Sequence, residues 1–221
     1  MERHFDEELA ALKKDITVMG TLVELSISNA IGALKELSCP AAEKVIAEDR
    51  VLDELEVKID ERCIDLLALR QPMATDLRLI TMAIEITTDL ERMGDLAVDI
   101  AQRVIELCDK PLLKPLIDIP KLAETAKRMT RQAIDSFVNQ DGLLARQVIF
   151  EDARADEIRN AIQTELMHDY MLKDPKTITR AMPLLLVARH LERICDHATN
   201  IAEDIIYFIE AKSVKHHHEK L

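Results

Sequence analysis

The chain has 221 residues, of which 48% are hydrophobic, 32% are charged and only 3% are aromatic. This composition, with four glycines and no Trp, favours helices over a β-sandwich or a β-barrel. The 29 Lys and Arg residues against 41 Asp and Glu residues leave a formal net charge of -12. Such a surface repels phosphate backbones and attracts cations, so direct nucleic-acid binding is not expected.

Proline residues divide the chain into long segments in which apolar residues recur at helical spacing. This pattern predicts an all-α protein with six long helices, near residues 5–37, 41–70, 75–109, 119–139, 142–172 and 176–212. Pro183 falls inside the last of them and is expected to kink it, because proline lacks the N–H that a helix interior requires.

The first predicted helix contains an apolar stretch, residues 16–34, which is interrupted by Glu24, by other polar side chains and by two glycines. A membrane-spanning helix needs about 18 or more apolar residues in a row, so no direct membrane insertion is expected. The stretch is nevertheless too apolar for a helix face surrounded by water. We therefore predict that part of this helix faces a second subunit.

The four cysteines lie far apart in the sequence and form no Cys-x-x-Cys pair; they are Cys39, Cys63, Cys108 and Cys195. The N-terminus also lacks the basic and then apolar pattern of a signal peptide. Both features indicate a reducing, cytoplasmic compartment. We therefore predict four free thiols, mostly buried in the core.

The sequence contains an internal repeat. A shift of 103 residues matches Asp49 and Asp53 with Asp152 and Asp156, and a shift of 101 residues matches the segment Leu-Glu-Arg-x-x-Asp at 90–95 with its copy at 191–196. The repeat predicts two tandem, pseudo-symmetric three-helix bundles. We place them at residues 1–110 and 121–213, joined by a linker at 111–120 and followed by a polar tail at 214–221 that contains three histidines.

Acidic side chains recur four residues apart on four of the predicted helices. Residues at this spacing are offset by only about 40° around a helix and about 6 Å along it, so their carboxylates can share one cation. The second helix carries such a row at Asp49, Asp53, Glu56 and Asp60. The predicted metal ligands of both halves are Asp49, Asp53, Glu91, Asp95, Asp99, Asp152, Asp156, Glu192, Asp196 and Asn200.

Oxygen ligands of this kind favour hard cations such as Mg²⁺, Mn²⁺, Ca²⁺ or iron over a thiolate zinc site. A simpler interpretation is that the rows are the solvated faces of amphipathic helices, since apolar residues lie opposite the acids of the third helix; these are Leu90, Met93, Ala97, Ile100 and Val104. In another alternative, Arg92 and Arg193 form the ion pairs that hold the rows together.

Enzyme motifs are weak in this sequence. His190 and His197 lie beside the acidic row of the last helix, where we expect them to pair with nearby acids. A ferritin-like carboxylate metal oxidase needs two Glu-x-x-His motifs on facing helices, and only Glu165 with His168 fits this pattern. No nucleophile elbow, glycine-rich phosphate loop or catalytic triad is present in the sequence.

Three segments together resemble the PhoU family: residues 71–78 (QPMATDLR), 89–95 (DLERMGD) and 191–203 (LERICDHATNIAE). The resemblance covers nearly the whole chain and implies the tandem three-helix fold. It also implies a cytoplasmic, non-enzymatic regulator of phosphate uptake that silences the phosphate-starvation response. Such a regulator acts as an adaptor between the ATPase subunit of the phosphate ABC transporter and a membrane sensor histidine kinase.

The same resemblance implies a homodimer, and it implies divalent or trivalent metal ions, with iron, Mn, Mg or Zn as candidates. Its metal-binding motifs correspond here to the pairs Asp49 with Asp53, Glu91 with Asp95, Asp152 with Asp156 and Glu192 with Asp196. Two differences between the halves, Asp99 against Asn200 and Gly94 against Cys195, predict that the two sites differ in affinity or preferred metal. A metal-independent docking surface for basic partners is the competing hypothesis.

Overall fold

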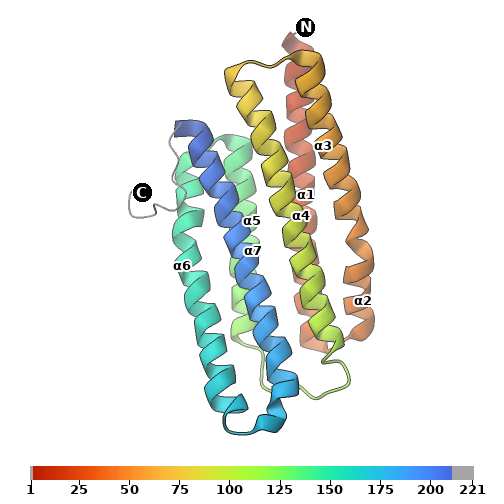
Figure 1. The fold of residues 1–221 in the computed structure, drawn as a ribbon, viewed down its shortest axis with the longest axis vertical. Helices are drawn as coiled ribbons and strands as arrows, with labels where there is room; N and C mark the ends of the chain where they lie inside the picture. Colours follow the sequence, from red (N-terminus) through yellow and green to blue (C-terminus); the bar gives the residue numbers. More distant parts are fainter. Residues whose placement is uncertain (1, 211–221) are drawn as a thin grey trace.

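The structure is a computed structural model that describes the backbone of residues 2–210 and the side chains of residues 5–209. Figure 1 shows two groups of long helices packed side by side, with α1 to α4 in one group and α5 to α7 in the other. The α-helices are α1 (Glu2–Glu36), α2 (Cys39–Glu48), α3 (Arg50–Arg70), α4 (Ala74–Ile105), α5 (Asp118–Asn139), α6 (Gly142–Glu165) and α7 (Ile178–Glu210). The predicted all-α fold of two three-helix repeats is thereby confirmed. The polar tail lies outside the described residues.

Polar side chains and left-handed residues define the ends of these helices. Ser38 accepts a hydrogen bond from the backbone N–H of Ala41 at 3.3 Å, which caps α2, and Asp141 caps α6 in the same way. Gln71 and Gln140 adopt left-handed backbone angles directly after α3 and α5, in the position where glycine is most common. At both turns a glutamine rather than a glycine therefore occupies the left-handed position.

The predicted helix at 41–70 is divided in the structure. α2 and α3 meet at Asp49, whose backbone angles (φ -58°, ψ -33°) are still those of a right-handed helix, so the two helices form one bent rod. The predicted helix at 75–109 ends earlier, at Ile105, where turns lead into the linker. α6 continues into a π-helix, Leu166–Met171, and a short 3-10 turn, Pro175–Thr177, precedes α7.

α7 continues through Pro183, which cannot donate a hydrogen bond to the carbonyl of Thr179 one turn earlier. The Lys110 ammonium donates to that carbonyl at 3.3 Å instead. Arg180 in turn donates to the carbonyl of Pro111 at 3.4 Å. Lys110, the last residue before the linker, therefore satisfies the carbonyl that proline leaves without a partner, and Pro111 attaches the start of the linker to the first turns of α7.

The two halves share one hydrophobic core. α4 and α7 run in opposite directions along the middle of the molecule and pack against each other, so the last helix of each repeat forms the junction (Figure 1). The apolar residues predicted opposite the acids of α4 are fully buried, as expected; they are Leu90, Met93, Ala97, Ile100 and Val104. Burial of these residues turns the acidic side of α4 outward.

α1 is long and apolar enough to cross a membrane by length and composition, over Phe5–Glu36, a criterion that core helices of other proteins also meet. In this fold it packs against α2, α3, α4 and α5. Its residues Leu12, Ile16 and Met19 are fully buried, whereas Val18 and Leu25 are about half exposed. Much of the apolar surface that suggested a second subunit is therefore covered within the chain itself.

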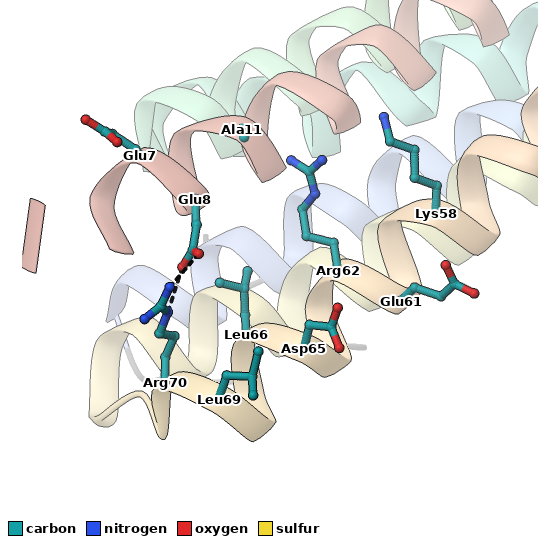
Figure 2. Close-up of a pocket in the computed structure, with 10 residues that line it drawn as sticks. All are labelled: Glu7, Glu8, Ala11, Lys58, Glu61, Arg62, Asp65, Leu66, Leu69 and Arg70. Carbon is teal, nitrogen blue, oxygen red and sulfur yellow. Dashed lines mark hydrogen bonds and ion pairs between the residues drawn. The ribbon is translucent and has the colours of Figure 1, made fainter. Parts of the chain in front are cut away.

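A groove of about 510 Å³ runs between the first turns of α1 and the last turns of α3 (Figure 2). Arg70 spans one end with two hydrogen bonds to Glu8, at 2.8 and 2.7 Å, and Lys58 and Arg62 extend from α3 toward α1, where both pair with Asp15. None of the predicted metal ligands lines this groove. It belongs to the packing of α1 on α3 rather than to the candidate site.

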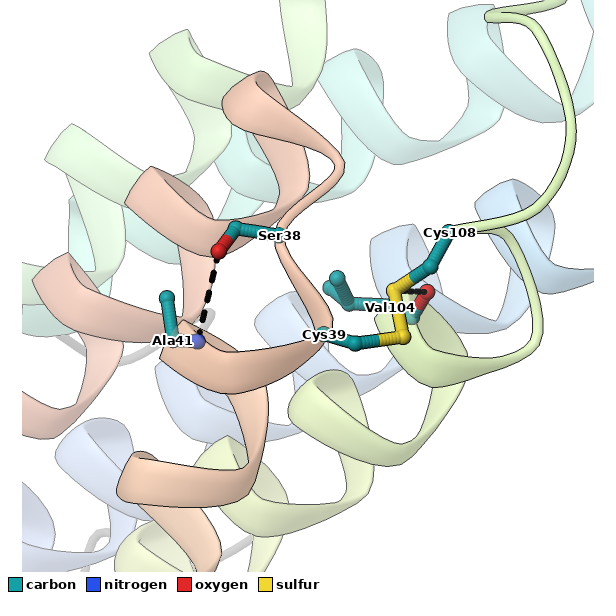
Figure 3. The surroundings of a disulfide bond; sticks show 5 residues. All are labelled: Ser38, Cys39, Ala41, Val104 and Cys108. Carbon is teal, nitrogen blue, oxygen red and sulfur yellow. Dashed lines mark hydrogen bonds between the residues drawn. A yellow bond between two sulfur atoms is a disulfide. The ribbon is translucent and has the colours of Figure 1, made fainter.

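The prediction of four free thiols is wrong for two cysteines. Cys39, the first residue of α2, forms a disulfide with Cys108, just beyond the end of α4 (Figure 3). The bend between α1 and α2 brings two residues that are 69 positions apart in the sequence to a Cα–Cα distance of 5.7 Å. Cys63 and Cys195 are free and buried, as predicted.

Candidate metal centre

The acids of the first half lie where α3 begins to pack on α4. A Cβ atom added at Gly94 would lie 2.7 Å from Leu52 Cδ1 and 3.2 Å from Asp49 Oδ1, so the absence of a side chain there allows the close approach. The equivalent positions of the second half hold Ala155 and Cys195, both fully buried. In the first half the large residue of this contact is Leu52 on α3 and the small one is Gly94 on α4. In the second half the smaller residue, Ala155, is on α6 and the larger one, Cys195, is on α7.

Burial and mutual repulsion raise the pKa values of the first-half acids. The pKa of Asp49 is raised to about 6, first by burial and then by Asp53 and Asp95. The pKa of Glu91 is raised to about 7, first by burial, then by Asp95 on the same helix, and then by Glu56, Asp53 and Asp49. The pKa values of Glu56, Asp60 and Asp95 are raised as well, mainly by burial. The rows of α3 and α4 therefore face the same space.

Cations do not compensate these charges within the part of the chain that the structure describes. Asp49, Asp53, Glu91 and Asp95 form no ion pair with Lys or Arg there. Asp60 has a buried Oδ1 atom without a hydrogen-bond partner. Asp99 at the far end of the row places its Oδ2 3.7 Å from Nδ1 of His190 and has no Lys or Arg partner among the described residues. The first half therefore holds a row of uncompensated carboxylates.

The second half has the same backbone plan but arginines among its acids. Arg159 on α6 places Nη2 3.1 Å from Glu192 Oε1 on α7 and 3.3 Å from Asp156 Oδ1. Arg189 lies 3.3 Å from the same oxygen of Glu192, whose side chain is buried. Arg128 on α5 pairs with Glu151 on α6. Cations of the chain itself thus neutralise much of this row.

The remaining second-half acids line a cavity of about 450 Å³, whose walls include Asp152, Arg193, Asp196, His197, Thr199, Asn200 and Glu203. The pKa of Asp196 is raised to about 6, by burial first and then by Glu192 and Asp152. The structure therefore brings three predicted ligands, Asp152, Asp196 and Asn200, around one space. Glu192 and Asp156 are instead held by arginine.

A histidine joins the two halves, and the predicted pairing with an acid is confirmed for His197, whereas Nδ1 of His190 lies near Asp99 without a hydrogen bond. His197 Nδ1 on α7 lies 2.8 Å from Asp89 Oδ1 on α4, and both side chains are buried. Burial lowers the pKa of His190, which keeps that ring neutral beside Asp99 near neutral pH. By contrast, Arg92 and Arg193 are exposed and form no ion pair among the described residues, which argues against the alternative in which they hold the rows together.

Sequence reasoning missed Arg159, Arg189 and Glu203. One of them carried a signal, because the 103-residue shift that aligns the acids also aligns Arg159 with Glu56. The contact between Arg159 and Glu192, which lie 33 positions apart, depends on how α6 packs on α7 and is not visible in the sequence.

The donor set of the first half fits a hard cation, because it consists of carboxylate oxygens whose charge is uncompensated. In the described part of the chain, however, no three His, Cys, Asp or Glu side chains already converge as metal ligands. The Glu-x-x-His pair fits an oxidase centre poorly, since Glu165 pairs with Lys114 and His168 is exposed. The acids can therefore take up a cation or contact a basic partner.

Comparisons with known proteins agree on one family. A family model described as the PhoU domain matches residues 16–104 and again residues 119–205. The phosphate-specific transport system accessory protein PhoU homolog of Aquifex aeolicus is 46% identical over 214 residues, which cover 97% of this chain and 96% of that protein.

Solved structures give the same result. The crystal structure of PhoU from Pseudomonas aeruginosa has a TM-score of 0.89 at 35% identity and covers 94% of this chain and 100% of its own. The phosphate transport system regulatory protein PhoU from Streptococcus pneumoniae has a TM-score of 0.88 at 28% identity and covers 95% and 99% of the two chains. This chain therefore belongs to the PhoU family, a family of accessory and regulatory proteins rather than enzymes.

Proposed function

We propose that this protein is a cytoplasmic, cation-dependent regulator of phosphate uptake and of the phosphate-starvation response. It acts as an adaptor between the ATPase subunit of the phosphate ABC transporter and a membrane sensor histidine kinase, and it works as a homodimer. The resemblance to accessory proteins of the phosphate-specific transport system supports this role. The observation that carries the cation dependence is the row of uncompensated carboxylates on α3 and α4.

Metal binding would change the surface that this regulator presents. Without a cation, burial first and then repulsion from neighbouring acids disfavour the charged forms of Asp49, Glu91 and Asp95 and raise their pKa values. A bound Mg²⁺, Mn²⁺ or iron ion supplies the missing positive charge and draws the carboxylates of α3 and α4 together. The helix pair then presents a less acidic and more rigid face for docking.

Elemental analysis tests the site assignment. The full chain is loaded with Mn²⁺, dialysed and measured beside two variants, Glu91→Gln/Asp95→Asn on α4 and Glu61→Gln/Asp65→Asn on the groove side of α3. We expect the first variant to lose bound metal and the second to keep the wild-type content. Because all three proteins retain the tail histidines, their differences report on the acidic row. Equal metal content in all three would refute the assignment.

A metal-independent docking surface is the second candidate function. The absence of three converging metal ligands in the described part of the chain favours it, as does the exposure of Asp53 and Asp95. Here the acids contact a basic patch on the partner directly. Pull-down of the transporter ATPase subunit separates the two: a chelator weakens capture in the metal-dependent case, whereas added salt alone weakens it in the direct one.

A further inference from the structure

The internal repeat places opposite charges at one position of the acidic rows. When Asp49 and Asp53 are aligned with Asp152 and Asp156, the next position that faces the row holds Glu56 in the first half and Arg159 in the second. One turn further, Asp60 is aligned with Gln163. The acidic row of α3 thus becomes a row with a built-in cation on α6.

The Arg159 side chain occupies the space between the acids of α6 and α7. Its Nη2 atom lies within 3.3 Å of both Asp156 and Glu192, and the side chain is 20% exposed. Glu192 is the most buried acid of this row, with a side chain 7% exposed. A charge-assisted hydrogen bond to a carboxylate this deeply buried supplies the positive charge that the group requires.

Glu56 is the first-half counterpart of Arg159 and carries the opposite charge. Its side chain is partly buried on α3, and its pKa is raised first by this burial and then by Asp60, Asp53 and Asp95. The first half therefore has an additional acid at the position where the second half has its cation. Sites with the same backbone differ most strongly at this single pair of residues.

We infer that Arg159 is a resident counter-ion that takes the place of a metal ion in the second half, so that cation uptake is confined to the acids of the first half. A cation entering the second row would have to displace the guanidinium from Glu192 or bind beside a like charge. The inference rests on the proposed cation uptake only for its statement about the first half.

The test replaces Arg159 by glutamine and counts bound Mn²⁺ by the electron paramagnetic resonance signal of the free ion. We expect Arg159→Gln to bind one more Mn²⁺ per chain than the wild type, and adding Glu192→Gln and Asp196→Asn to abolish that gain. Arg154→Gln, on the exposed side of the same helix, removes the same charge and should bind no additional ion. Circular dichroism verifies that each variant is folded.

The reciprocal variant is Glu56→Arg, which copies the second half into the first. It should lose the Mn²⁺ that the wild type binds, whereas Glu61→Arg, an exposed site on the same helix, should retain it. Because Glu56 is only partly buried, we expect Glu56→Arg to fold, so its Mn²⁺ content can be measured even if Arg159→Gln folds poorly.

The possible outcomes separate this inference from the proposed function. If the wild type binds no metal but Arg159→Gln gains an ion, the counter-ion role stands and the first-half site is refuted. If folded Arg159→Gln binds no more metal than the wild type, the counter-ion role is overturned whatever the wild type binds. Loss of wild-type metal on replacing Glu192 and Asp196 would also overturn it, because the second half would then bind metal beside Arg159.

Discussion

In the first half, the carboxylates of α3 and α4 face one another without a Lys or Arg partner among the described residues, whereas in the second half Arg159 and Arg189 hold Glu192. In each half the acidic row lies on two long helices that pack against each other, α3 on α4 in the first half and α6 on α7 in the second. A duplicated backbone thus preserves where the acids lie but not how their charge is balanced. A few substitutions within a repeat, such as Arg159 in place of Glu56 and Arg189 in place of Thr88, make two similar sites chemically unequal.

The disulfide is the difference with the largest expected effect on stability, since the second half has no counterpart. Cys39→Ser should lower the free energy of unfolding by about 4 kcal/mol under oxidising conditions, because the bond closes a long loop of the unfolded chain. Urea unfolding with and without a thiol reductant measures this effect. The variant and the wild type should unfold together once the bond is reduced, and a difference that persists would point to packing instead.

The contact between Leu52 on α3 and Gly94 on α4 predicts the second largest effect on stability. Gly94→Cys introduces the residue of the second half beside Leu52, where its Cβ has no room, and should destabilise the fold by about 1–3 kcal/mol. Adding Leu52→Ala copies the second-half pair completely and should recover part of that loss. A double-mutant cycle from denaturant unfolding measures the coupling, and purely additive effects would show that the two positions do not compensate each other.

The smallest expected effect is a pH dependence of stability. The pKa of Glu91 is about 7 in the folded chain, against an ordinary value of 4.5 in the unfolded chain. Between pH 4.5 and pH 7, the folded chain therefore keeps a proton on Glu91 that the unfolded chain has released. Its contribution to stability therefore falls as pH rises through this window, by on the order of 1 kcal/mol or less after solvent screening. Glu91→Gln should become more stable relative to the wild type between pH 5 and pH 7.5.

A control of opposite sign is available in the second half. Lys173 lowers the pKa of Asp169 through a hydrogen bond, so Asp169 contributes stability above its ordinary pKa and loses that contribution on acidification. Asp169→Asn should therefore be less stable than the wild type near neutral pH, with the difference vanishing at low pH. Thermal unfolding across pH compares both variants, and parallel curves for Glu91→Gln and the wild type would contradict the raised pKa of Glu91.

Helical periodicity, prolines and the internal repeat were sufficient to predict the all-α fold and the rods that carry the acidic rows, because these signals arise within one helix. Residues Leu90 and Met93 are buried opposite Glu91 for this reason. Local signals also located most helix boundaries, although the break at Asp49 and the π-helix at 166–171 were not predicted.

The tertiary structure alone decided which of these charges are balanced. The contacts Arg159 with Glu192, His197 with Asp89 and Cys39 with Cys108 each join segments far apart in the sequence. A sequence pattern gives the direction of a side chain around its own helix, whereas the partner depends on how two helices are rotated and spaced against each other. The acidic rows were therefore visible in the sequence, and their unequal neutralisation became visible only once the helices were packed.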